Sequence, residues 1–327
     1  MAESQLKIGL VTEPLASRPL GEVMDWVVAE VPEIGGLEIG TGAYAPTGHC
    51  DMPRLLKESA ARQAWKGEIE ARGLEISALN CWGNPLHPDL GTARRHDAAL
   101  RDTIRLAGEL GTERIVALAG CPAGSAGDST PHFAGGGWLP YLENVYQRQW
   151  EHQIHDYWAE IGEFATRTAP TLSICLELHP GTVAYNVETF ERLAAVSPAI
   201  AANIDPSHFM WMQMDSRRVV QRLAGRIGHA HGKDVIFDEE KLALNGLLDH
   251  RWPAPAADMP WNFATVGRGH GMAWWQALLR DLAAAGKVKT IAIEHEDPFV
   301  EPKTGIREAA RLLAEALSGA ATVRTES

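Results

Sequence analysis

The stretch Ile200-Ala-Ala-Asn-Ile-Asp-Pro-Ser-His208 joins a short apolar run to a carboxylate and, three residues later, to a histidine. The apolar start predicts a buried strand over 200–205. An aspartate at the end of such a strand needs a cation, hydrogen-bond donors or a metal ion, because an isolated buried charge is unfavourable. Taken alone, Asp205 and His208 are better explained as a helix cap or turn than as a pair of ligands.

Similar apolar runs recur along the chain, and segments of helical periodicity separate them. Eight strand–helix pairs predict an α/β fold of the (β/α)8 TIM-barrel type. The first strand is not followed by the Gly-rich turn that is typical of a doubly wound sheet. The expected strands are 7–12, 36–41, 74–80, 114–120, 173–178, 200–205, 227–232 and 289–294. The expected helices are 19–31, 52–72, 94–110, 142–168, 187–196, 215–225, 273–285 and 305–318.

The length of the chain is compatible with one domain. We expect residues 1–327 to form a single barrel, since barrels of this type reach that size and no linker or low-complexity segment interrupts the sequence. Two segments, about 121–141 and 234–272, follow expected strands and are too long for simple connections. We expect them to be irregular loops on the C-terminal face of the barrel, forming a lid or a subunit interface.

The composition excludes several classes of protein. The chain has 42 acidic and 30 basic residues and a formal charge of −12, which disfavours nucleic acid as a partner. The N-terminus predicts neither a signal peptide nor a membrane span, so we expect a cytoplasmic protein without a membrane partner. The 11 tryptophans exceed what core filling explains and suggest sugar-stacking walls or the interface of a homo-oligomer. Four of them fall in or near the face loops: Trp82, Trp138, Trp211 and Trp261.

Metal-competent side chains end four consecutive expected strands. Glu177 ends the fifth and Asp205 the sixth, His231 lies in the seventh, and Glu294 ends the eighth. Neighbouring strand ends lie side by side in a barrel, so these side chains could share one divalent cation whose charge compensates three buried carboxylates. Each residue alone has a plainer explanation, but four successive strand ends together favour a metal site.

These residues carry a family resemblance that covers nearly the whole chain. The chain resembles the xylose isomerase-like barrel superfamily, in particular its sugar phosphate isomerase/epimerase branch, in an ordered set of motifs: Glu177, Asp205-x-x-His208, His231-x-Lys233-Asp234, Glu294, and the segments 80–88 and 266–271. In the ketose 3-epimerases of that branch, residues matching Glu177, Asp205, His231 and Glu294 bind one divalent metal. The two glutamates also move protons, and the histidine that matches His208 contacts the substrate.

The resemblance implies a metal-dependent sugar isomerase or epimerase. The metal polarises a carbonyl, a carboxylate removes the neighbouring proton, and an enediolate is reprotonated. We expect Glu177 and Glu294 to form the acid/base pair and manganese to be the preferred metal, with magnesium, cobalt, iron and zinc as alternatives. Further substrate contacts are expected from His87, Lys233, Arg268 and His270. For Asp234 we favour an ion pair with Lys233.

A second activity stays open because of His179, two residues after Glu177. This histidine either orients a carboxylate or serves as an additional catalytic acid or base. The Glu-x-His step also resembles the large subunit of C-glycoside deglycosidases, lyases that enolise a 3-keto glycoside, expel the aglycone and pair with a small β-rich subunit. Endonuclease IV-type DNA repair is disfavoured, since the third and fourth strands end without histidine. A binding protein that had lost the chemistry would lack a ligand, and all four are present.

Overall fold

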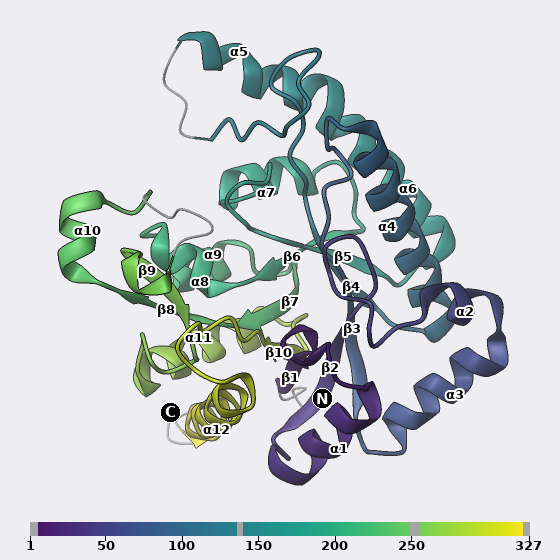
Figure 1. The fold of residues 1–327 in the computed structure, drawn as a ribbon, viewed down its shortest axis with the longest axis vertical. Helices are drawn as coiled ribbons and strands as arrows, with labels where there is room; N and C mark the ends of the chain where they lie inside the picture. The colour runs from purple at the N-terminus through teal and green to yellow at the C-terminus, as the bar shows by residue number, and fades with distance from the viewer. Residues whose placement is uncertain (1–5, 136–139, 249–254, 323–327) are drawn as a thin grey trace. The chain divides into compact units, whose positions relative to one another are not determined.

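The expected barrel is confirmed by the structure, a computed structural model that describes residues 6–135, 140–248 and 255–322. Eight parallel strands close in the order β1-β10-β7-β6-β5-β4-β3-β2 (Figure 1). They are β1 Lys7–Val11, β2 Ile34–Gly40, β3 Glu75–Cys81, β4 Arg114–Leu118, β5 Ser173–Glu177, β6 Ile200–Ile204, β7 Ile227–Gly232 and β10 Thr290–Ile293. Every strand boundary lies within about two residues of the expected one, as apolar runs bounded by turn residues allow.

Packing divides the chain into two units. The first consists of Met1–Leu37, Arg72–Glu75 and Ile204–Ser327, and the second consists of Glu38–Ala71 and Ile76–Asn203. The extent of a single domain over residues 1–327 stays a prediction.

In the first unit, β10 pairs in parallel with both β1 and β7, and this pairing places Ala292 beside His231. The two long helices α11 (Met272–Ala284) and α12 (Pro302–Thr322) pack against each other (Figure 1). The unit also contains η1 Glu13–Leu15, α1 Leu20–Glu30, α8 Pro206–Trp211, α9 Ser216–Arg222, α10 Glu239–Asn245 and η3 Ala256–Asp258. Strands β7 and β10 are buried throughout, as expected for strands covered on both faces.

In the second unit, β3, β4, β5 and β6 pair in parallel, with Val116 beside Cys175. These two residues form a buried cluster with Ala78. The helices are α2 Met52–Lys57, α3 Ser59–Glu70, α4 Leu90–Leu110, α5 Pro140–Gln149, α6 His155–Thr168 and α7 Val187–Ala194, and one π-helical turn, η2 (Trp150–Ile154), joins α5 to α6.

Several helix ends follow the expected capping chemistry. Asn186 and Thr189 form a reciprocal capping box at the start of α7. Gly73, Gly111 and Gly286, each expected just past a helix, have φ angles of 73°, 70° and 80°. A side chain would be strained in that left-handed region, so glycine allows the chain to turn there.

Two expectations about element boundaries are wrong. The helix expected over 52–72 is broken at Glu58, whose backbone is extended (φ −113°, ψ 101°), so that α2 and α3 are separate. The segment 234–272 is not irregular: β8 (Asp234–Phe237) pairs antiparallel with β9 (Trp261–Ala264), and α10 follows β8 (Figure 1). In the segment 121–141, residues 121–135 form no helix or strand. Residue Trp138 lies outside the described residues, as do 249–254 of the other segment.

Candidate metal centre

Three of the four expected metal ligands lie together in the first unit. Asp205 directly follows β6, His231 lies in β7, and Glu294 directly follows β10. They are 1%, 0% and 6% exposed, and their ligand atoms lie within 4.8 Å of one another. The Glu294 backbone N–H donates to the Gly232 carbonyl, which extends the pairing of β10 with β7 and brings Glu294 beside His231. His231 Nδ1 lies 3.0 Å from Glu294 Oε2.

Asp205 performs two tasks at once. Its Oδ1 accepts the Ser207 backbone N–H at 2.9 Å and caps the short helix α8, so the capping explanation of this motif is correct. Its Oδ2 lies 2.9 Å from Lys233 Nζ and 3.4 Å from His208 Nε2. Burial acts to raise the pKa of Asp205, but Lys233, His208 and His231 outweigh burial and hold that pKa below its usual range. Asp205 is therefore a carboxylate at neutral pH.

Lys233 is only 2% exposed and lies among three carboxylates. Its Nζ is 2.9 Å from Asp205 Oδ2, 2.8 Å from Glu294 Oε2 and 2.7 Å from Glu296 Oε2. It also lies 4.4 Å from the centre of the Phe263 ring. The expected ion pair between Lys233 and Asp234 is wrong, because the described contacts of Asp234 are hydrogen bonds to other groups.

His208 is buried beside this cluster and is neutral. Burial lowers the pKa of His208 to about 4, although the Asp205 carboxylate acts in the opposite direction. Its ring packs edge-on against Phe263, with ring centres 5.6 Å apart. A neutral imidazole can donate or accept a hydrogen bond without adding charge to the site.

The donor set fits a divalent cation. Asp205 Oδ2 is buried, and its described polar neighbours are Lys233 Nζ at 2.9 Å and His208 Nε2 at 3.4 Å. Two carboxylates and an imidazole are ligands that manganese, magnesium, iron, cobalt and zinc accept. The 3.0 Å between His231 Nδ1 and Glu294 Oε2 brings the two groups close enough that they could hold the same ion.

In the second unit, Glu177 ends β5 and is 2% exposed. Trp82 Nε1 donates to Glu177 Oε2 at 3.2 Å, and the backbone N–H of Trp82 donates to Asn80 Oδ1. This contact gives Trp82 a polar role that its expected stacking function did not include. His179 Nδ1 lies 2.5 Å from the Pro180 carbonyl oxygen, which favours a proton on Nδ1.

Sequence reasoning missed one buried carboxylate in this unit. Glu38 is 0% exposed in β2, and Asn80 Nδ2 donates to its Oε1 at 2.5 Å. The only sequence signal was a charged residue inside an otherwise apolar run, Gly36-Leu-Glu-Ile-Gly40. Such a residue needs a buried partner, and Asn80 at the end of the next strand supplies it.

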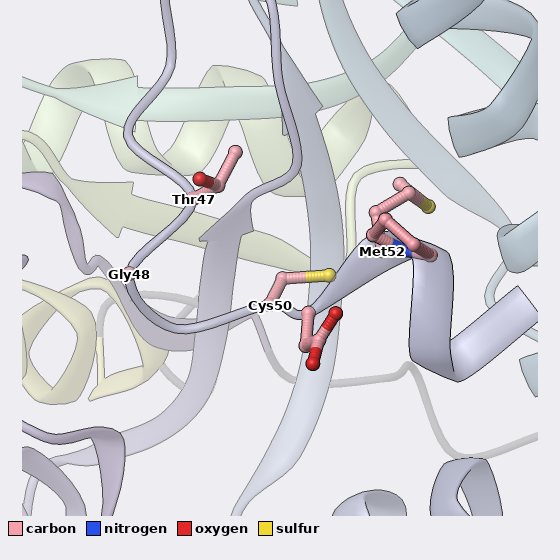
Figure 2. A pocket seen from close by; sticks show the side chains of 6 residues that line it. Thr47, Gly48, Cys50 and Met52 are labelled. Atoms are coloured by element: carbon pink, nitrogen blue, oxygen red, sulfur yellow. The ribbon is translucent and has the colours of Figure 1, made fainter.

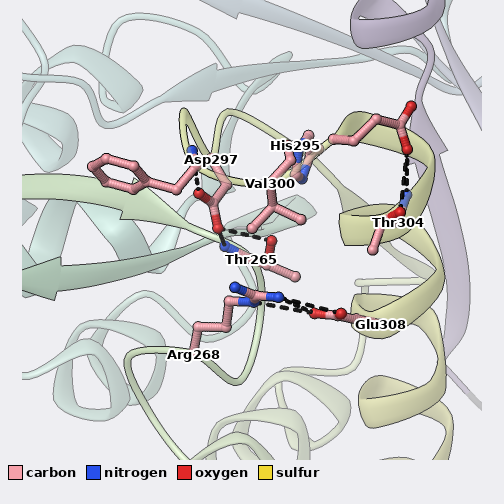
Figure 3. A network of polar contacts seen from close by, with 9 residues as sticks. Thr265, Arg268, His295, Asp297, Val300, Thr304 and Glu308 are labelled. Carbon is pink, nitrogen blue, oxygen red and sulfur yellow. Dashed lines mark hydrogen bonds and ion pairs between the residues drawn. The ribbon is translucent and has the colours of Figure 1, made fainter. Parts of the chain in front are cut away.

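The remaining expected substrate contacts have polar partners of their own. His87 Nδ1 accepts the Asp89 backbone N–H at 2.9 Å near the start of α4. Arg268 forms a double contact with the carboxylate of Glu308 on α12, at 2.9 to 3.2 Å (Figure 3). Their contact with substrate stays a prediction, as does that of His270. Of the other tryptophans, Trp211 and Trp261 stack on each other, with ring centres 4.8 Å apart and planes 8° apart.

The loop at 266–271 closes around the buried carboxylate of Asp234. Asp234 Oδ2 accepts the backbone N–H groups of Gly267, Gly269 and His270 at 3.0, 3.2 and 2.9 Å. His270 Nδ1 lies 2.8 Å from Asp234 Oδ1. A Cβ atom on Gly269 would lie 2.0 Å from the Val235 carbonyl oxygen, so only glycine fits there. The glycine-rich segment 266–271 is thus a structural clamp in the described contacts.

A second network holds the start of the same loop. Asp297 Oδ2 accepts both the backbone N–H and the hydroxyl of Thr265, each at 2.9 Å, and Asp297 Oδ1 accepts the Phe299 backbone N–H. Figure 3 shows these bonds beside the Arg268–Glu308 pair. The loop is therefore tied to the segment after β10 as well as to Asp234.

Two cavities are lined by residues other than the expected metal ligands. One of about 480 Å³ in the first unit is lined by residues that include Met210, Phe237, His270 and Trp274. One of about 350 Å³ in the second unit is lined by Thr47, Gly48, Cys50, Asp51, Met52 and Pro53 (Figure 2). Burial raises the pKa of the Cys50 thiol to about 12, so this wall offers no nucleophile.

No helix in the described part of the chain has both the length and the apolar character needed to cross a bilayer.

The comparisons with known proteins agree with this fold. Protein YfiH of Bacillus subtilis (strain 168), whose function is uncharacterized, is 32% identical over 317 residues, covering 96% of this chain and 100% of YfiH. The probable 3-DHS dehydratase AsbF of Bacillus anthracis has a TM-score of 0.64 at 15% identity, covering 94% of this chain and 99% of AsbF.

Two further solved structures share the barrel. L-ribulose 3-epimerase has a TM-score of 0.62 at 15% identity, covering 98% of this chain and 97% of its own. The IolI protein with a bound zinc atom has a TM-score of 0.61 at 16% identity, covering 96% and 98%. A family model described as xylose isomerase-like TIM barrel matches residues 36–316. Because that match spans most of the chain, the protein belongs to the xylose isomerase-like TIM barrel family.

Proposed function

We propose that the protein is a divalent-metal-dependent sugar isomerase or epimerase that abstracts a proton next to a carbonyl group. The observation that carries the proposal is the convergence of Asp205, His231 and Glu294, which come from three distant parts of the sequence and place buried ligand atoms within 4.8 Å. Lys233 supplies one positive charge beside the two carboxylates, so burying these groups together favours a further cation.

Glu177 is proposed as the fourth ligand. It ends β5, which follows β6 in the strand order, so the ordered strand ends β5, β6, β7 and β10 each supply one donor. Its hydrogen bond from Trp82 would orient the carboxylate toward a metal or substrate. L-ribulose 3-epimerase and the zinc-bearing IolI protein share this barrel, which supports the proposed class of enzyme.

Different residues are proposed for proton transfer and for substrate binding. A bound divalent ion supplies Lewis-acid polarisation of a carbonyl and acidifies the neighbouring C–H bond. Glu177 and Glu294 are the proposed base and acid that move the proton between two carbon positions or faces. Neutral His208 is proposed to hydrogen-bond a substrate oxygen, and His179 to orient Glu177 or assist the proton transfer. The proposed substrates are free ketoses and keto-sugars.

The test combines metal content with proton exchange. Wild type and the variants Asp205→Asn, Glu177→Gln and Glu294→Gln would be loaded with manganese and analysed for bound metal. Each would then be incubated in D₂O with a panel of ketoses and 3-keto glycosides. Glu163→Gln is the matched control, since Glu163 is a surface carboxylate paired with Arg167.

We expect about one ion per chain and carbon-bound deuterium with wild type and Glu163→Gln, and loss of both with Asp205→Asn. The change to asparagine keeps the cap of α8, because asparagine is also a good capping residue. Release of an aglycone from a 3-keto glycoside would replace the isomerase by the lyase activity. Retention of full metal binding by Asp205→Asn would overturn the metal site.

A further inference from the structure

Lys233 is a buried cation placed where a divalent ion is proposed to bind. Its ammonium group lies 2.9 Å from Asp205 and 2.8 Å from Glu294, two of the proposed ligands. A lysine so deeply buried is stable as a cation only when carboxylates surround it. Lys233 and the proposed divalent ion would therefore both interact with Asp205 and Glu294.

The third carboxylate near Lys233, that of Glu296, is partly exposed and is not a proposed metal ligand. Glu296 lies 2.7 Å from the ammonium group but its side chain is 46% exposed, and it belongs to none of the candidate ligand groups found among the described residues. The bond from Lys233 to Glu296 has hydrogen-bond geometry. Glu296 can therefore hold the ammonium group while Asp205 and Glu294 bind another cation.

The charges at the site indicate whether Lys233 strengthens or weakens the binding of a divalent ion. Glu177, Asp205 and Glu294 carry three negative charges, so a divalent ion alone leaves the proposed site at −1 and Lys233 brings it to zero. Two cations that share carboxylates repel each other, and the repulsion is strong where water is excluded. Lys233 changes the charge of the empty site from −3 to −2, and it repels an incoming divalent ion.

We propose that Lys233 sets the metal affinity of the site by competing with the divalent ion for Asp205 and Glu294, and that Glu296 relieves this competition by holding Lys233. This inference rests on the proposed metal site and adds its regulation. Lys233 and Glu296 are positioning residues in this scheme, since they act on the metal through its ligands.

The test is a titration of chelator-treated protein with Mn²⁺, followed by calorimetry, for wild type, Lys233→Met and Glu296→Gln. Lys233→Met should bind Mn²⁺ on the order of 10-fold more tightly, and Glu296→Gln several-fold more weakly, within the usual range of coupling between sites. Opposite shifts are the signature of competition. The controls for net charge are Lys241→Met and Glu239→Gln, which change surface residues of the α10 segment.

Thermal unfolding supplies a second readout. Without metal, Lys233→Met should melt below wild type because its carboxylates lose their cation, and Mn²⁺ should raise its melting temperature more than that of wild type. If Lys233→Met fails to fold, the weaker binding of Glu296→Gln alone decides. Unchanged or tighter binding by Glu296→Gln, or weaker binding by Lys233→Met, overturns the inference.

The two proposals fail in distinguishable ways. If wild type binds no Mn²⁺, or if Asp205→Asn binds it equally well, the metal site itself is wrong. If Asp205→Asn loses Mn²⁺ while Lys233→Met and Glu296→Gln bind it like their controls, the metal site stands and only the competition is wrong.

Discussion

Replacing Gly269 by alanine should open the clamp around Asp234. The new Cβ atom would lie 2.0 Å from the Val235 carbonyl oxygen and 2.6 Å from Asp234 Oδ1. Ordinary contacts of this kind begin near 3.4 Å, so the loop must move by at least about 1 Å. The N–H···O distances from Gly269 and His270 to Asp234, now 3.2 and 2.9 Å, would then exceed hydrogen-bond range.

The size of the effect follows from these two bonds. Hydrogen bonds to a charged acceptor contribute about 1.5 to 3 kcal/mol each, and Asp234 is fully buried, so water does not replace the lost donors. Partial relaxation of the loop retains some of this energy. We expect Gly269→Ala to lower the free energy of unfolding by about 3 kcal/mol.

The assay is equilibrium unfolding in urea, with Gly271→Ala as the matched control two residues away. A Cβ atom on Gly271 meets nothing within 4 Å, and its φ of −76° suits any residue. This control should cost about 1 kcal/mol, since alanine is a poorer helix N-cap than glycine but meets no clash here. Equal destabilisation by the two substitutions would refute the role assigned to the clamp.

Three further predictions concern single side chains. The pKa of His208 is about 4 in the folded state and near 6.5 in the unfolded chain, so the unfolded chain binds the proton first and the free energy of unfolding decreases as the pH is lowered. Between pH 7 and pH 5, wild type should lose about 2 kcal/mol more than His208→Gln in urea unfolding. Equal losses would contradict the assignment of His208 as neutral and buried. Burial raises the pKa of all four thiols to about 11 or 12, so a disulfide reagent at pH 8 should modify none of them until the protein unfolds: Cys50, Cys81, Cys121 and Cys175. Gly67 is exposed inside α3 with nothing within 4 Å of a Cβ atom, so Gly67→Ala should raise the unfolding free energy by about 0.5 to 1 kcal/mol, and a lower melting temperature would be unexpected.

The barrel strands were predictable because each is a short apolar run that turn or polar residues bound. The ribbon of β8 and β9 was not, because each strand has four residues and its partner lies far along the chain. The break at Glu58 carries no glycine or proline that would have indicated it.

The candidate site also contains residues that the sequence placed correctly and one that it did not. Asp205, His231 and Glu294 could be located because strand ends in a parallel barrel meet at one edge. Lys233 was assigned the wrong partner because Asp234 is its neighbour in sequence. Successive residues of an extended chain point in opposite directions, so the two side chains diverge, one toward Glu294 and the other toward the 266–271 loop.

The clamp at Asp234 also limits where insertions and deletions can be tolerated in this chain. The backbone N–H groups of Gly267, Gly269 and His270 converge on a single carboxylate, so adding or deleting one residue between 265 and 271 would bring the wrong amides to it. By contrast, α10 buries none of its residues, and Leu244 and Leu248 are 76% and 92% exposed. Among relatives of this chain, insertions and deletions should therefore accumulate around 239–248 and be absent from the glycine-rich loop.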